Sequence, residues 1–419
     1  MKVLQVNCVY GVGSTGKITA ELHSGLQKNG IDSIVCYGRG KSTDQVGIYK
    51  TCGELYSKIN HFYAKLRGQL YGGCFLSTGK LITIIKREKP DIVHLQCING
   101  YFVNIFKLLD WLKRNHIKTV LTLHAEFMYT ANCGHARECE RWKSGCGKCP
   151  QLKSDLGSFG IDGTHSSWEK MNKAFHDFQN NLIVVSVSPW LKARAMQSPF
   201  LNDKKHCVIM NGLDISVFYP RMVEPLRQQY DLSKKMILYV TTTLTEKEND
   251  LKVGHYVLKL AELLKDENVC ILVAGRYDKT IQIPSNMVML GRLDNQDTLA
   301  QYYSMADLTI LTSKRETFSM VVAESLCCGT PVVGFQAGGP ESIALPEYSK
   351  FVEQGNVEAL KKAVLHVLSQ KMGRDDIAKT AGNAYSGERM VREYLQIYEE
   401  LMEEHYGQDK CHSTCMECS

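Results

Sequence analysis

The sequence lacks any apolar run that approaches the length of about 18 residues needed to span a bilayer. It also lacks an amino-terminal h-region, because the short apolar stretch at residues 3–6 passes directly into a glycine loop, so we expect no cleaved leader. It contains no internal repeat and no low-complexity segment. The net charge of +6 is too modest to indicate nucleic-acid binding, although it permits contact with an anionic ligand or membrane face.

The sixteen cysteines do not read as a disulfide framework. Many stand alone inside or beside apolar runs, which is typical of proteins in a reducing compartment, so we expect a cytoplasmic protein. The 419 residues predict two or three domains with an ample core for each. The content of 44% hydrophobic and 22% charged residues is ordinary for an α/β protein.

Strand-like and helix-like segments alternate twice along the chain. The predicted strands lie near residues 3–9, 33–37, 92–95, 119–123 and 182–187, then near 236–243, 269–274, 287–290, 308–311 and 331–335. Two such series predict an α/β protein with two doubly wound Rossmann-like lobes. A polar stretch at residues 214–235 is the expected linker, and ligands often bind in a cleft between such lobes.

The most informative segment is SKRETFSMVVAESLCCGTPVVGF at residues 313–335, which carries two carboxylates, Glu316 and Glu324. It follows the apolar strand at 308–311 and reads as strand end, loop, helix and next strand. Glu316 is then in the loop at the carboxyl end of a strand, where open α/β sheets bind ligands. Glu324 follows about two helical turns later, so the pair can address two parts of one elongated ligand.

A glycine loop, GVGSTGKI at residues 11–18, follows the first strand and opens a helix. Glycines let the backbone turn tightly, so the amides around Gly13, Ser14 and Thr15 can face a charged group at a helix amino terminus. The loop almost matches a P-loop, but Ile18 replaces the Ser or Thr that would hold Mg2+, and no clear Walker B strand completes such a site. A purely structural glycine turn is the alternative.

Two histidines lie at the carboxyl ends of predicted strands, where side chains can reach a ligand. His124 follows the strand at 119–123, with a loop directly after it, and is a candidate for ligand contact. His94 ends the strand at 92–95 with the same geometry. A lone histidine beside an apolar strand is usually structural, and we interpret His94 in that way.

The order and spacing of these segments resemble the family-4 retaining nucleotide-sugar glycosyltransferases of the GT-B fold. The motifs that carry the resemblance are the Glu-x7-Glu pair at Glu316 and Glu324, TPVV at 330–333, GGPE at 338–341 and NGLD at 211–214. Two further segments, NGYFVN at 99–104 and TLH at 122–124, resemble a subgroup found in capsule and exopolysaccharide assembly.

The resemblance implies two lobes that face each other across a cleft. The acceptor-side lobe would span residues 1–212, with a Cys-rich insertion near 125–166, and the nucleotide-sugar lobe would span 213–387. A helix at 388–406 would cross back to the first lobe, and a tail at 407–419 would follow. From the residues alone, that helix can equally well finish the second lobe.

The resemblance also implies a retaining, metal-independent hexosyltransferase. Such an enzyme would move a sugar from a UDP- or GDP-sugar to a glycan or a lipid-linked acceptor, would require no cofactor for catalysis, and would not use nucleic acid. The departing phosphate would act as the base for the incoming hydroxyl. This role suits a cytoplasmic enzyme that can also sit peripherally on the inner face of the cytoplasmic membrane.

The residue roles that the resemblance implies fall on both lobes. Glu316, His124 and Lys252 would be catalytic, with Lys252 facing the diphosphate. The donor-binding residues, which would meet the sugar, phosphates, ribose or base, would be Gly13, Ser14, Thr15, Arg292, Leu293, Thr317, Phe318, Ser319 and Glu324.

One expected family residue is missing, because residues 241–252 lack the arginine that usually accompanies the lysine. A diphosphate leaving group needs cations, since it gains negative charge as the glycosidic bond breaks. We assign the lysine role to Lys252, with Lys247 as an alternate and with Arg276 or Arg292 as a substitute for the arginine. Two alternatives stay open: a non-catalytic GT-B scaffold, and a P-loop-like nucleotide hydrolase.

Four cysteines gather in a loop-like segment: Cys133, Cys139, Cys146 and Cys149. The second pair has the spacing of metal ligands, whereas the first pair is looser than usual. Four thiolates can hold a structural zinc that orders the insertion, and free thiols are the alternative. The tail offers a second metal-binding group or simply a frayed terminus, with Cys411, His412, Cys415 and Cys418.

Residues 56–70 mix basic and apolar side chains, among them Lys58, Phe62, Lys65 and Leu66. Such a helix can lie on a membrane surface and receive a lipid-linked acceptor. An ordinary amphipathic helix that packs on its own lobe is the alternative.

Overall fold

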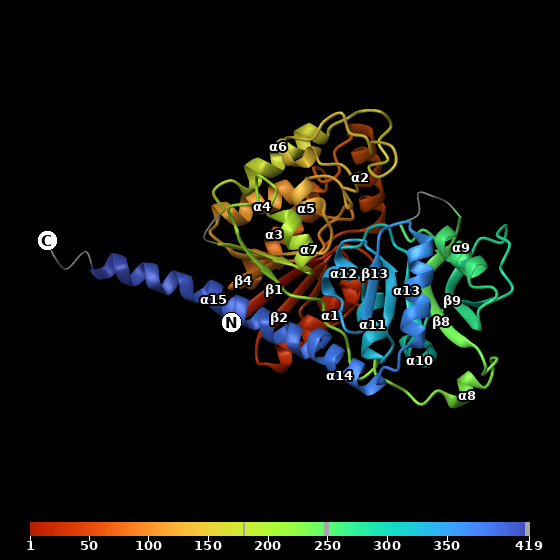
Figure 1. The fold of residues 1–419 in the computed structure, drawn as a ribbon. Coiled ribbons are helices and arrows are strands. Elements are labelled where there is room, and N and C mark those ends of the chain that lie inside the picture. The colour runs from red at the N-terminus through yellow and green to blue at the C-terminus, as the bar shows by residue number, and fades with distance from the viewer. Residues whose placement is uncertain (179–180, 247–250, 415–419) are drawn as a thin grey trace. The chain divides into compact units, whose positions relative to one another are not determined.

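The chain divides into two compact units, which Figure 1 shows coloured along the chain. The structure is a computed structural model that describes residues 1–178, 181–246 and 251–414, with side chains up to Glu403. The first unit comprises Met1–Ile209 together with Met390–Ser419, and the second comprises Met210–Arg389. Each unit is built around one parallel sheet.

The sheet of the first unit has seven strands in the order β3-β2-β1-β4-β5-β6-β7. The strands are β1 (Lys2–Asn7), β2 (Asp32–Tyr37), β3 (Ile48–Lys50), β4 (Ile92–Leu95), β5 (Lys118–Leu123), β6 (Leu182–Ser186) and β7 (Lys205–Val208). Val3, Leu4 and Val6 of β1 are fully buried, as expected for a central parallel strand. The strand order reverses between β1 and β4, and such a switch point favours ligand binding at the carboxyl edge.

The helices of the first unit are α1 (Gly13–Lys28), α2 (Glu54–Arg67), α3 (Phe75–Glu88), α4 (Ile105–Arg114), α5 (Phe127–Thr130), α6 (Thr164–Phe175) and α7 (Pro189–Ala195). The Cys-rich insertion lies between α5 and α6 and contains the short 3-10 helix η1 (Arg141–Lys143). The buried Glu126 carboxylate anchors this insertion: it accepts hydrogen bonds from the Ala136 amide (2.7 Å) and from Arg194 Nε (3.0 Å). A buried carboxylate held in this way fixes an otherwise irregular segment.

The sheet of the second unit has six strands in the order β10-β9-β8-β11-β12-β13. The strands are β8 (Lys235–Leu244), β9 (Val269–Tyr277), β10 (Met287–Gly291), β11 (Leu308–Leu311), β12 (Val332–Phe335) and β13 (Ser349–Val352). The helices are α8 (Glu224–Arg227), α9 (His255–Leu263), α10 (Gln296–Met305), α11 (Met320–Cys327), α12 (Gly339–Ile343), α13 (Val357–Ser369) and α14 (Arg374–Tyr385). Ile237, Ile271 and Ile310 from three neighbouring strands are fully buried in one core. Here the strand order reverses between β8 and β11.

The last helix, α15 (Gly387–Thr414), belongs to the first unit from Met390 onward. The Tyr398 hydroxyl lies 2.7 Å from His94 Nδ1, and the Tyr394 hydroxyl lies 2.8 Å from Thr122 Oγ1. Val391 packs so tightly on Gly25 that a Cβ at that glycine would lie 2.3 Å from a valine methyl group. Buried hydrogen bonds and close packing therefore hold the helix to the first sheet.

The predicted fold class, an α/β protein with two doubly wound lobes, is confirmed by the two parallel sheets. The strands β3, β7 and β13 are absent from the prediction because they are short edge strands with partly exposed residues. The helix predicted at 388–406 continues to Thr414, and residues 415–419 of the predicted tail lie outside the described residues. Within the described ranges, no helix combines the length and apolar character that crossing a membrane requires.

The buried histidines of the first unit predict an acid-sensitive fold. Burial, together with the nearby His124, lowers the pKa of His94 from 6.5 to about 3, and burial lowers that of His124 to about 4. Because the unfolded chain binds these protons more readily, stability is fully present above pH 6.5 and falls as the pH drops, by about 1.4 kcal/mol per pH unit for each histidine.

We expect the urea midpoint to fall between pH 6.5 and pH 4.5, followed by circular dichroism. A His94→Gln variant should be less stable at pH 7.5 but should show a shallower dependence on pH, since one titrating group is gone. An unchanged slope in this variant would contradict the assignment of His94 as a buried neutral side chain.

Candidate active site

The carboxyl edge of the second sheet carries a cavity of about 400 Å3. Residues from the ends of three neighbouring strands line it, together with Leu299 of α10: Val240, Thr241, Thr242, Thr243, Ala274, Gly275, Arg276, Arg292 and Leu293. Two arginines and three threonines make this a basic cavity with many hydrogen-bonding groups. Anionic ligands with hydroxyl groups suit such a lining.

The wall of the cavity depends on a close approach of two backbones. The register of β8 against β9 shifts between Val240 and Thr243, which marks a β-bulge. Gly275 on β9 has φ +155°, and a Cβ there would lie 2.2 Å from the Thr241 carbonyl oxygen. Only glycine fits, because any side chain would push the two strand ends apart.

Glu316 lies in the loop after β11, at the same edge of the sheet. Its amide donates to the Ala337 carbonyl (3.0 Å), and its own carbonyl accepts from the Gly339 amide (2.8 Å). The glycine is required, since a Cβ at Gly339 would lie 2.4 Å from the Thr317 backbone. The glycine turn after β12 therefore fixes the backbone of the Glu316 loop, and Glu341 in turn accepts hydrogen bonds from two amides of that turn.

The Glu316 carboxylate forms an ion pair with Lys252 and accepts a hydrogen bond from Ser313 Oγ. Burial raises the pKa of this carboxyl, but the Lys252 ammonium and the hydrogen bonds from Lys252 and Ser313 outweigh it, so the pKa lies below its ordinary value. Glu316 is thus a fixed carboxylate at neutral pH. The sequence predicted the glutamate and the lysine, but not Ser313 as their partner.

Lys252 is positioned by its own backbone. Its carbonyl accepts hydrogen bonds from Thr312 Oγ1 (2.8 Å) and from the Tyr239 hydroxyl (3.1 Å), and the next residue, Val253, has φ +48°. These contacts tie the loop after β8 to the end of β11, at the point where the strand order reverses. The alternate lysine, Lys247, lies outside the described residues.

The segment after Glu316 leads into α11 with an unusual backbone. Ser319 precedes the helix with φ +98°, a conformation that costs of order 1–3 kcal/mol for a residue with a side chain and often occurs at functional sites. The Phe318 side chain is buried, so this residue can offer a ligand its amide only. Thr317, between Glu316 and Phe318, is half-buried.

Glu324 projects from α11 and accepts a hydrogen bond from the Tyr303 hydroxyl (3.0 Å). Burial and the nearby glutamate raise the pKa of Tyr303 well above its usual value, so the tyrosine remains a donor. The Tyr303 hydrogen bond fixes the orientation of the Glu324 carboxylate. Tyr303 carries no sequence signal of this role, since it lies 21 residues earlier in the chain.

The remaining predicted residues lie on the first unit, at the carboxyl edge of its own sheet. Gly13, Ser14 and Thr15 form the first turn of α1, after the loop that follows β1, and Gly13 has φ +64°. His124 follows β5, and its Nε2 lies 2.7 Å from Gln96 Oε1. Because burial lowers its pKa to about 4, the imidazole is neutral at pH 7.

His94 has a structural role. It is fully buried, with its two ring nitrogens 2.7 Å from Tyr398 and 2.7 Å from Thr122. These contacts connect β4 and β5 to the last helix. A ligand at the sheet edge would find neither ring nitrogen available.

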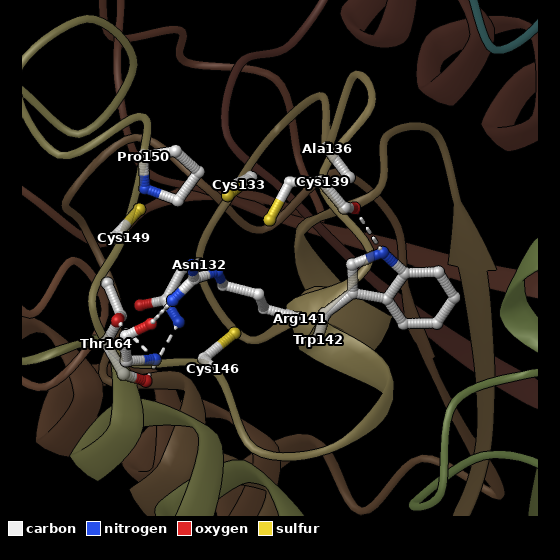
Figure 2. Close-up of a pocket in the computed structure, with 11 residues that line it drawn as sticks. Asn132, Cys133, Ala136, Cys139, Arg141, Trp142, Cys146, Cys149, Pro150 and Thr164 are labelled. Atoms are coloured by element: carbon white, nitrogen blue, oxygen red, sulfur yellow. Dashed lines mark hydrogen bonds between the residues drawn. The ribbon is translucent and has the colours of Figure 1, made fainter.

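The four cysteines of the insertion line one small cavity, and Figure 2 shows their thiols around it. Burial raises the pKa of the Cys146 thiol to about 12, so without a cation it stays protonated. In the part of the chain that the structure describes, no three His, Cys, Asp or Glu side chains are arranged to hold a metal ion. Structural zinc at Cys133, Cys139, Cys146 and Cys149 stays a prediction. The second cysteine group, in the tail, lies outside the described side chains.

Two doubly wound units with a Glu-x7-Glu pair at the carboxyl edge of the second sheet are typical of GT-B glycosyltransferases, and comparison with known proteins supports this class. Residues 224–384 match the family model for glycosyl transferases group 1, and residues 15–217 match that for glycosyltransferase family 4. The chain therefore belongs to the family-4 glycosyltransferases.

Relatives and solved structures span nearly the whole chain. WcaC of Escherichia coli K12, a candidate colanic acid biosynthesis glycosyl transferase, is 21% identical over 415 residues, which cover 96% of this chain and 100% of that protein. The N-acetyl-alpha-D-glucosaminyl L-malate synthase of Bacillus anthracis is 22% identical over 95% of this chain and 96% of its own length. The structure of Anabaena Alr3699/HepE in complex with UDP has a TM-score of 0.64 at 13% identity, with 96% of this chain and 100% of that chain covered. The predicted GT-B fold is confirmed.

The ion pair between Lys252 and Glu316 predicts a measurable coupling. Lys252→Met leaves a mostly buried carboxylate without its cation, so we expect the second unit to lose about 1–3 kcal/mol of unfolding free energy, less than for a fully buried pair. Lys252→Met/Glu316→Gln should recover part of this loss in a double-mutant cycle by urea denaturation. Lys235→Met is the control, because Lys235 is more exposed and should lose less. Additive single effects would mean that the pair does not form.

Metal content tests the zinc prediction. Protein purified without chelators is expected to contain one zinc ion per chain by mass spectrometry, because four thiolates bind zinc tightly. A Cys146→Ser/Cys149→Ser variant should lose the metal, whereas Cys207→Ser, outside the cluster, should keep it. Metal-free protein whose four thiols all react with a thiol reagent would make the prediction wrong.

Proposed function

We propose that the protein transfers a sugar, with retention at the anomeric carbon, from a nucleoside-diphosphate sugar to a hydroxyl of a glycan or lipid-linked glycan. The observation that carries the proposal is the row of cations at the carboxyl edge of the second sheet. Lys252 lies there against Glu316. Arg276 and Arg292, of which Arg292 pairs with Asp294 (2.6 Å), line the cavity at the same edge. A diphosphate is the ligand chemistry that such a row of cations suits.

The two arginines supply what the 241–252 segment lacks. The leaving diphosphate gains charge as the glycosidic bond breaks, and one cation about 4 Å away is worth a few kcal/mol at an effective dielectric constant near 20. Arg276 follows Gly275 at the end of β9, and Arg292 follows β10, so both side chains start at the cavity rim. In this proposal one of them takes the role of the absent family arginine.

The nucleoside would extend along the same edge. In this proposal the Glu324 carboxylate, which accepts a hydrogen bond from Tyr303, would also accept hydrogen bonds from the ribose hydroxyls. Leu293 in the cavity lining would border the base. UDP- and GDP-sugars are the candidate donors, and the structure of HepE in complex with UDP-glucose, with a TM-score of 0.62, supports this class of ligand.

Each unit carries its own candidate donor contacts. On the second unit, Glu316, with the amides of Phe318 and Ser319, would position sugar hydroxyls. On the first unit, neutral His124 and the Gly13, Ser14 and Thr15 turn are the groups that we propose for contact with the donor. The departing phosphate would take the proton of the incoming hydroxyl on the same face, so retention requires no metal ion and no protein base.

The biological role that we propose is polysaccharide assembly on the cytoplasmic side of the membrane. The relationship to WcaC supports this role, because the printed name of that relative places it in colanic acid biosynthesis. The motifs at 99–104 and 122–124 point to the same capsule and exopolysaccharide subgroup.

Turnover of UDP- and GDP-sugars in the presence of EDTA tests the proposal through release of the nucleoside diphosphate. We expect one base to be preferred, and Glu316→Gln to lower turnover by about 100-fold or more, as expected for loss of a positioning carboxylate. Glu347→Gln, an exposed glutamate of the same unit, is the matched control and should keep full activity.

Retention is checked by the anomeric signal of the product in proton NMR. A product of inverted configuration would contradict the mechanism. ATP hydrolysis that needs Mg2+ and is lost in Lys17→Ala would favour a P-loop hydrolase. Absence of turnover with every donor, despite nucleotide binding, would favour a non-catalytic scaffold.

A further inference from the structure

Helix α2 is amphipathic, but its apolar face is exposed to solvent. Its buried residues are Ser57 and Ala64, whereas its large apolar side chains face solvent. Leu55, Ile59, Phe62 and Leu66, at spacings of four, three and four residues, form one stripe along the helix and are 43–72% exposed. An amphipathic helix that only packs on its own lobe buries its apolar stripe. The exposed stripe therefore argues against the alternative that α2 is such a helix.

The tip of the Cys-rich insertion extends the stripe. Phe159 and Ile161 are both more than 60% exposed, and the Phe159 ring lies 5.8 Å from that of Phe62, between ring centroids. The Phe159 amide donates to the Lys65 carbonyl (3.2 Å), so the tip is attached to α2. We call the surface formed by Leu55, Ile59, Phe62, Leu66, Phe159 and Ile161 the α2 face. A contiguous exposed apolar surface of this kind is typical of a surface that binds another protein or a membrane.

Basic residues border the α2 face on both sides. Lys58 and Lys65 lie on one flank of the stripe and Arg67 on the other, by helical spacing. The single acidic residue of α2, Glu54, is engaged with Arg39 and the Gly40 amide. The net charge that this helix presents to a partner is therefore positive.

The carboxylates of the insertion near its tip are also engaged. Asp155 pairs with Arg137 (3.0 Å), and Asp162 accepts hydrogen bonds from the Cys149 amide (2.7 Å) and from Thr164. These bonds hold both carboxylates within the insertion. The charge complementarity of the α2 face is thus with an anionic partner.

We propose that the α2 face docks on a bilayer that contains anionic lipids. The apolar stripe would enter the boundary between headgroups and acyl chains, and the three basic side chains would reach anionic headgroups from its flanks. A bilayer fits better than a protein partner, because long basic side chains beside a narrow stripe match a headgroup layer. The docking proposal rests on the proposed function only where it gives the docking a role, which is the capture of a lipid-linked acceptor.

Vesicle sedimentation tests the proposal. We expect the protein to pellet with phosphatidylcholine vesicles that contain phosphatidylglycerol, and to pellet less with phosphatidylcholine alone. Phe62→Ser/Leu66→Ser should lower the partition coefficient by about tenfold or more, since two large side chains no longer leave water. Val46→Ser/Met222→Ser removes two exposed apolar side chains elsewhere and should bind like the original protein.

Charge reversal separates the electrostatic part. Lys58→Glu/Lys65→Glu should abolish the preference for anionic vesicles, and salt should weaken binding of the original protein. Donor turnover with a water-soluble acceptor should be unchanged in these variants, so a failure of the docking proposal is distinct from a failure of the proposed enzyme activity.

Two results would overturn the proposal. The original protein could remain in the supernatant with every vesicle composition. Alternatively, sedimentation velocity could show a dimer that Phe62→Ser/Leu66→Ser dissociates, with no binding to vesicles, which would make a second copy of the chain the occupant of the α2 face.

Discussion

Parallel pairing of buried strands is the constraint on which the arrangement of both units depends. Each strand must be followed by a connection that returns to the amino edge, so every loop that directly follows a strand gathers at the carboxyl edge. In the second unit this brings together the ends of β8, β9, β10 and β11, although 74 residues separate Thr242 from Glu316 in the chain. The reversal of strand order between β8 and β11 leaves room there for a ligand.

The second consequence is electrostatic. Carboxylate and ammonium groups at this edge are partly withdrawn from water, so the pair of Glu316 and Lys252 holds two opposite charges ready at one point. Hydrogen bonds to the Lys252 carbonyl and the glycine turn beside Glu316 fix both backbones. A site with charges positioned before the ligand arrives needs little rearrangement, which is the property that transfer of a charged leaving group requires.

Features that depend on neighbouring residues could be predicted from the sequence, whereas features that depend on packing could not. The strands at 92–95 and 308–311 were predictable to the residue, because apolar runs bounded by turns are local. Edge strands such as β13 were not, since their partly exposed residues have no clear pattern. Motif spacing identified Glu316 and Glu324, but the partners Ser313 and Tyr303 depend on packing. The spacing of the apolar residues in α2 predicts an apolar stripe, but it does not show whether that stripe faces the core or solvent.

We propose that a nucleoside diphosphate binds along the carboxyl edge of the second sheet, and a crystal structure with UDP or GDP bound would show its position. We expect the diphosphate beside Lys252 and the cavity arginines, with the ribose hydroxyls at Glu324. A diphosphate seated instead in the loop at residues 11–17, with the second sheet edge unaltered, would contradict it.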